Sequence, residues 1–165
     1  MSSILRFCSR NSLDSVFKEN FCSAKVNAGL FGLFLRSLRE AKKGDALKKI
    51  SFEPAGCYIS ASNLKKLTDS CQNISKIDLS NCDVDDHLLR GYGSALSKRA
   101  NRIESFDLSG NNKLTPSGLQ RFVDTATCID RIDCSRCIRI PNANGLNLAG
   151  RKTVVITGNW PSFKY

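Results

Sequence analysis

The chain has 165 residues, a formal net charge of +10, and 41% hydrophobic against 24% charged residues. This balance excludes a disordered chain and suits one domain with its own core, while the positive excess favours RNA, an anionic membrane surface or acidic proteins as partners. The longest apolar run, residues 28–35, is about 8 residues where a membrane span needs about 20, so we expect no transmembrane helix.

Residues 1–25 are rich in serine and carry four Lys or Arg against two acids. Four apolar residues between positions 13 and 21 fall on one helical face, which suits either a mitochondrial transit peptide or an amphipathic helix. The two acids are uncommon in presequences, and an uncleaved targeting segment reconciles both interpretations. We therefore expect a mitochondrial protein on the matrix side, either free there or bound at the surface of the inner membrane. A cytoplasmic location is the alternative.

Residues 26–46 are expected to form a helical cap that ends at Gly44. Four cations load the C-terminal end of this helix, where the helix dipole stabilises positive charge. The apolar stripe of the cap consists of Leu30, Leu33, Phe34 and Leu38. Its cations are Arg36, Arg39, Lys42 and Lys43. The cap either covers the edge of the following sheet or docks its basic end on a protein partner, RNA or anionic lipid.

Three later segments repeat one nine-residue pattern. They are Ile74–Cys82, Ile103–Asn111 and Ile129–Cys137, each with apolar residues at positions one, four and six and Cys or Asn at position nine. Alternation over positions three to seven predicts strands, in which Ile77 and Leu79 point inward while Lys76, Asp78 and Ser80 point outward. The ninth residue lies at the turn, where it can bond backbone groups that a short strand leaves unpaired.

Weaker copies of the pattern flank these three. One starts at Leu47, and the other starts near residue 151, with Val154 as its fourth residue and Asn159 as its ninth. Starts at 47, 74, 103, 129 and 151 give spacings of 27, 29, 26 and 22 residues. Periods of roughly 20–29 residues are typical of leucine-rich repeats.

Helical spacing of apolar residues lies between the strands. It covers 64–71 after Ser60, 88–96 after Asp85, and 119–123 after Thr115-Pro, where Pro near the first position favours a helix start. Strand and helix in alternation predict an α/β fold, namely a short leucine-rich-repeat solenoid with a parallel sheet inside, helices outside and an N-terminal helical cap. The arc of four to five units would occupy residues 47–159, followed by an aromatic tail at 160–165.

The repeats resemble the ribonuclease-inhibitor-like or cysteine-containing class of leucine-rich repeats. Within that class, residues 49–60 followed by Leu64-Lys-Lys-Leu67 resemble the first repeat of the mitochondrial ATP synthase factor B family, whose members are short, with an N-terminal helical region and few irregular repeats. The resemblance implies a non-catalytic accessory subunit that binds other proteins of ATP synthase or a respiratory complex. A mitochondrial ribosomal protein contacting rRNA and a cytosolic leucine-rich-repeat adaptor are the alternatives.

The outward strand positions form the candidate partner-binding surface. Stacking is expected to give an acidic column of Glu53, Asp78, Asp107 and Asp133. Beside it we expect a column of Lys49, Lys76, Ser105 and Arg131. Ser80, Ser109 and Ser135 form a third column, or else shape the turn together with the Asp residues. The opposite signs favour a protein partner, because stacked acids repel a phosphate backbone; RNA would instead meet the basic N-terminal region or the loops of Lys98, Arg99 and Arg102.

Other chemistry has weaker support. The cysteines at 57, 71, 82, 128, 134 and 137 fall where repeats bury small side chains, which indicates packing and a reducing compartment. Cys134 and Cys137 have the spacing of one cysteine pair of a zinc site, and Cys128 would be a third ligand. The sequence contains no second pair with this spacing. His87, the only histidine, begins a helix after Asp85-Asp86. With no nucleotide-binding or metalloprotease motif, we expect no enzyme, no metal and no cofactor.

Overall fold

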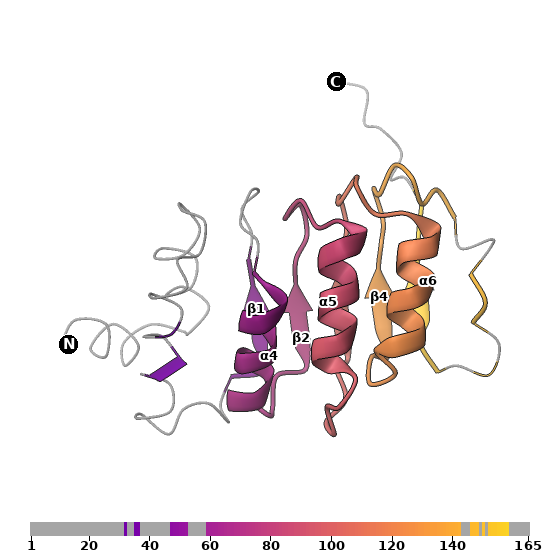
Figure 1. The fold of residues 1–165 in the computed structure, drawn as a ribbon. Coiled ribbons are helices and arrows are strands. Elements are labelled where there is room, and N and C mark those ends of the chain that lie inside the picture. The colour runs from indigo at the N-terminus through magenta and orange to yellow at the C-terminus, as the bar shows by residue number, and fades with distance from the viewer. Residues whose placement is uncertain are drawn as a thin grey trace.

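The computed structural model describes residues 32, 35, 36, 47–52, 59–142, 146–148, 150 and 152–158. Over this part of the chain the protein is α/β, with one parallel five-stranded sheet and three helices (Figure 1). The strands are β1 (Lys49–Ser51), β2 (Lys76–Asp78), β3 (Ser105–Asp107), β4 (Arg131–Asp133) and β5 (Val154–Ile156). They lie in the sheet in the order in which they occur in the sequence.

The three helices begin where the sequence places polar N-caps. They are α4 (Ala61–Ser70), α5 (Asp86–Leu96) and α6 (Pro116–Thr125). Ser60, Asp85 and Thr115 each accept a hydrogen bond from the backbone N–H three residues ahead, which satisfies a donor that the first helical turn leaves unpaired. The predicted helical segments are therefore confirmed, and Figure 1 shows the three helices side by side on one face of the sheet.

The core lies between this face and the helices. The parallel register aligns Ile50 with Ile77, Ile77 with Phe106, and Phe106 with Ile132, so the fourth residues of the pattern form one buried row. Phe106 also contacts Phe122 of α6, with ring centroids 5.3 Å apart. The prediction that these apolar residues stand side by side in one parallel sheet is confirmed, and their burial supplies the main stabilising term.

The ninth residue of the pattern joins neighbouring strand segments. In all three segments it donates a hydrogen bond to the carbonyl oxygen of the sixth residue in the preceding segment. The donor–acceptor distances are 3.7 Å for Cys82 to Phe52, 2.9 Å for Asn111 to Leu79 and 3.3 Å for Cys137 to Leu108. The residues that carry these carbonyl groups are buried, and a buried carbonyl oxygen without a donor would destabilise the fold. The bonds therefore have the role that the pattern predicted for the ninth residue.

The register of the last strand differs from the prediction. Val155, not Val154, aligns with Ile132, and Val154 is 58% exposed. Thr153 is buried instead, and its hydroxyl donates to the carbonyl oxygen of Ile129 at 2.8 Å. A slip of one residue moves every side chain of a strand to the other face, so placing Val154 at the fourth position was wrong.

Little of the N-terminal region lies in the described part. Leu35 is buried and belongs to the core cluster of the sheet and helices, whereas Arg36 is exposed. The apolar stripe predicted for the cap omitted Leu35. The other predicted cap residues, together with 1–25 and 160–165, lie outside the described residues; those of the cap are Leu30, Leu33, Phe34, Leu38, Arg39, Lys42 and Lys43.

Candidate functional site

The outward face of the sheet carries a row of cations at the first position of its strands. Lys49 of β1, Lys76 of β2 and Arg131 of β4 are exposed, and we call them the cation row. The register sets Lys49 beside Lys76, and Lys76 beside Ser105 of β3. Because the buried fourth residues point to the helices, their neighbours point to solvent, so this predicted column is formed as expected.

A second row, of carboxylates, lies two residues further along the same strands. We call Asp78, Asp107 and Asp133 the acid row; the register places Asp78 beside Asp107, and Asp107 beside Asp133. Neighbouring strands are about 4.8 Å apart, so like charges here stand close together. The two rows give the face a fixed pattern of opposite signs.

Each carboxylate of the acid row is held by the turn that follows its strand. The Oδ1 atoms of Asp78, Asp107 and Asp133 accept the backbone N–H two residues ahead, at 3.1, 2.8 and 2.9 Å. Asp78 has two further donors, the hydroxyls of Ser51 at 3.1 Å and Ser80 at 2.8 Å. These bonds offset the mutual repulsion of the acids and fix their positions, so the acids also shape the turns.

Two of the predicted columns need correction. The residue beside Asp78 is Ser51, because Ser51 is the fifth residue of the first copy and Glu53 is the seventh. Glu53 itself lies outside the described residues. Ser80 and Ser109 do not form an exposed column, since they are only 5% and 4% exposed. Each strand ends at its Asp, and the serine lies in the turn that begins there, where its neighbours cover it. The hydroxyl of Ser80 donates to Asp78, and that of Ser109 accepts from Arg136.

Sequence reasoning also missed two members of this face. Ser51 was not predicted to contact Asp78, although both are the fifth residues of their copies of the pattern. Glu104 lies 3.8 Å from the amino group of Lys76, an exposed pair that contributes little stability. No periodic signal marked Glu104, because it precedes its strand at a position that holds serine or aspartate in the other two segments.

Two arginines predicted as RNA contacts have structural bonds instead. The guanidinium of Arg99 donates to the carbonyl oxygens of Thr68, Gln72 and Ile74 at 2.7–3.0 Å, and its partial burial lowers the pKa of Arg99. Arg99 thereby closes the end of α4 and lines a hollow of about 210 Å³ with neighbouring polar residues. Arg102 donates to Asp130 at 2.6 Å, and this hydrogen bond raises the pKa of Arg102.

The cysteines of the described residues belong to the core of the protein. Cys71, Cys82, Cys128, Cys134 and Cys137 are all buried in the core cluster, while Cys57 lies outside the described residues. A hydrogen bond with Cys137, together with burial, raises the pKa of Cys134, while the same hydrogen bond lowers the pKa of Cys137. Burial raises the pKa of Cys128. A raised pKa keeps the thiols of Cys134 and Cys128 protonated, and Cys137 is buried and donates to the carbonyl oxygen of Leu108, which agrees with a packing role for all three.

Other chemistry is sparse over the described residues. No cluster of three or more His, Cys, Asp or Glu side chains there could hold a metal ion. His87 is exposed at the start of α5, where its Nδ1 lies 3.2 Å from Arg90. Within the same residues, no helix has the length and hydropathy to cross a bilayer.

Comparisons with known proteins add no family assignment. No protein-family model matches the chain, and no curated protein sequence matches it. The resemblance to factor B therefore stays a prediction, and the case for function depends on the geometry of the sheet face.

Proposed function

We propose that the chain is a short leucine-rich-repeat arc that binds a protein partner through the cation row and the acid row and has no catalytic role. The observation that carries this proposal is the pair of oppositely charged rows, held in register on one exposed face. A partner that offers acids to one row and bases to the other gains specificity and a defined orientation, because a shifted docking would bring like charges together.

The rigid turns favour recognition over a role in stability alone. Because Asp78, Asp107 and Asp133 are positioned before a partner arrives, binding costs less in side-chain order than it would with mobile carboxylates. The repeat assignment is supported by the sequential parallel order of the strands and by the recurring bond from the ninth residue.

A protein partner is favoured over RNA. The acid row would repel phosphates, and two of the three loop cations expected to meet RNA are engaged, Arg99 by backbone carbonyls and Arg102 by Asp130. Of these three loop cations only Lys98 remains exposed without such a bond. The basic N-terminal region, the other expected RNA contact, lies outside the described residues except for residues 32, 35 and 36.

We place this binding role in a mitochondrial assembly, as an accessory subunit of ATP synthase or a respiratory complex. The support is the composition of residues 1–25 and the resemblance of the first repeat to factor B. A fluorescent fusion of residues 1–45 tests the location, and we expect mitochondrial signal. Cytosolic signal would favour the adaptor alternative.

The binding face is tested by a matched pair of charge reversals. Arg131→Glu changes the cation row, whereas Arg121→Glu makes the same change at an exposed position of α6. Tagged full-length chains are purified gently and the associated proteins are quantified by mass spectrometry. We expect partners that are depleted about tenfold or more by Arg131→Glu and retained by Arg121→Glu. Equal recovery with both variants would rule out the sheet face as the binding site.

A further inference from the structure

Within the described residues, the last strand of the sheet has a neighbouring strand on one side only. β5 ends the strand order, and its bonds to β4 use alternate residues: Val154 donates to Asp130 at 2.7 Å, and Ile156 accepts from Cys134 at 2.8 Å. Because backbone groups alternate in direction along a strand, Val155 and Thr157 point their N–H and C=O groups away from β4. No hydrogen bond joins those groups to another described residue.

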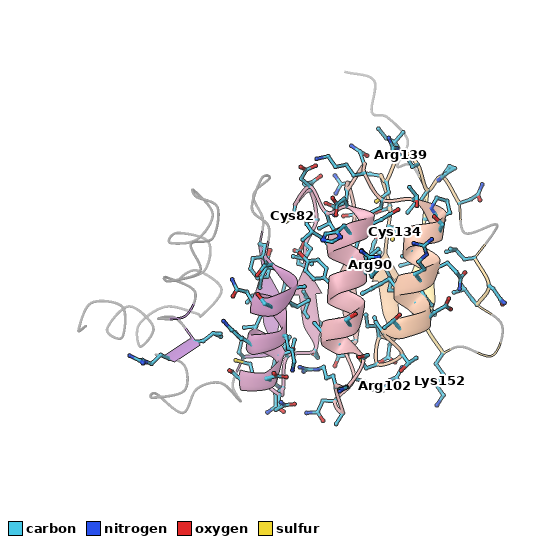
Figure 2. All side chains as sticks on the ribbon, viewed as in Figure 1. Cys82, Arg90, Arg102, Cys134, Arg139 and Lys152 are labelled. Carbon is cyan, nitrogen blue, oxygen red and sulfur yellow. The ribbon has the colours of Figure 1, made fainter. Side chains whose placement is uncertain are left out.

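The side chains along this edge are apolar and basic. Val154 is one of two large hydrophobic residues that are exposed in the described part, at 58%. Lys152, exposed just before the strand, lies at the same end of the sheet as Arg102, and Arg131 stands beside Val154 (Figure 2). Neither Lys152 nor Arg131 forms an ion pair within the described residues.

Two acids lie near this edge, and one of them forms an ion pair. Asp130 is bound to Arg102, whereas Asp133, which stands beside Ile156, accepts the backbone N–H of Ser135 and keeps its charge. Within the described residues, the edge of β5 therefore combines unpaired backbone donors and acceptors with an exposed valine and two cations that form no ion pair. The cations lie where the strands begin, and Asp133 lies where β4 ends.

We infer that the open edge of β5 docks an extended acidic segment of a partner protein, which adds to the sheet as a sixth strand. Backbone pairing to Val155 and Thr157 would supply affinity, and acidic side chains of the segment would meet Lys152 and Arg131. A second copy of this chain is a poorer occupant because it would bring a second basic edge. The backbone groups of this contact lie outside the two charged rows, but Arg131 belongs to the cation row, so the inference shares that one residue with the function proposed above. Lys152, Val155 and Thr157 are not shared, and the tests of the inference depend on them.

The test uses the full-length, isotope-labelled chain and two short capped peptides, one alternating Glu and Val and the other alternating Lys and Val. Fluorescence anisotropy measures affinity, and hydrogen exchange of individual amides locates the contact. We expect the acidic peptide to bind about tenfold or more tightly than the basic one and to slow exchange at Val155 and Thr157 by a similar factor. The amides of Val154 and Ile156, which face β4, should change little.

Variants then separate backbone pairing from nonspecific charge. Thr157→Pro removes an edge donor, so it should weaken the acidic peptide about tenfold, while Thr157→Val keeps the N–H and should bind as the wild type does. If circular dichroism shows that Thr157→Pro is unfolded, Lys152→Glu at its exposed site replaces it and should reverse the preference between the two peptides.

Three outcomes would overturn the inference. Equal binding of both peptides, or binding of neither, would remove the acidic segment as occupant. Exchange protection at Val155 and Thr157 in the free monomer would show that the chain covers its own edge. Protection that grows with protein concentration, together with a dimer in sedimentation, would assign the edge to a second copy.

Discussion

Asn111 offers the sharpest test of how adjacent strand segments are joined. Its side chain is fully buried, donates to the carbonyl oxygens of Leu79 and Leu108 at 2.9 and 2.8 Å, and accepts the N–H of Val84 at 2.8 Å. In Asn111→Ala the carbonyl of Leu108 still accepts from the thiol of Cys137 at 3.3 Å. The carbonyl of Leu79 and the N–H of Val84 each lose the partner that Asn111 provides. Each buried group without a partner costs about 1–3 kcal/mol, and we expect a loss of about 3–4 kcal/mol in the free energy of unfolding.

The other segments suggest an intermediate substitution. Cys82 and Cys137 occupy the same position as Asn111 and donate to the same carbonyl of the preceding segment. Asn111→Cys should therefore keep a bond to Leu79 and lose only the acceptor for Val84, at a cost of about 1–2 kcal/mol.

The measurement is urea denaturation followed by far-ultraviolet circular dichroism, with Asn112→Ala as a control. Asn112 is exposed and accepts only the N–H of Ile138, so its loss should stay below about 1 kcal/mol. The reasoning is refuted if Asn111→Ala costs no more than Asn112→Ala, or if the Cys variant is as unstable as the Ala variant.

Two further perturbations probe the packing. Leu79→Ala should lower the free energy of unfolding by about 2–5 kcal/mol, because Leu79 is fully buried and the substitution leaves a cavity; a loss below about 1 kcal/mol in urea denaturation would contradict its inward position. Gly118→Ala should lower the melting temperature although Ala is the better helix former, because its Cβ would lie 2.0 Å from Oδ1 of Asp86, which bonds Thr115 at the start of α6. An unchanged or higher melting temperature would mean that Asp86 moves aside at little cost.

The parts of the fold that could be predicted are those with a clear period. Ile77, Phe106 and Ile132 alternate with polar neighbours, so the sequence alone predicts their inward direction. The helix starts were equally predictable, because Ser60, Asp85 and Thr115 precede apolar residues at helical spacing.

The errors occur where the period is missing. Val154, Val155 and Ile156 are all apolar, so alternation could not set the register of β5, and only the pairing with β4 does so. Ser80 and Ser109 were wrongly expected to be exposed, because each strand stops after three residues and the turn that follows covers the serine. The structural use of Arg99 had no local signal, since the carbonyls that it binds are 25 to 31 residues away in the sequence.

The sequential order of the strands also determines the order in which parts of the molecule unfold. β3 pairs only with β2 and β4, and α5 joins α4 to α6, so no described strand or helix bridges over the middle of the sheet. Heating should accordingly unfold the outer strands, which have one strand neighbour among the described residues, before the central ones. A substitution that disrupts β3, by contrast, would leave two short parts of the sheet, each with too few strands to form a stable core.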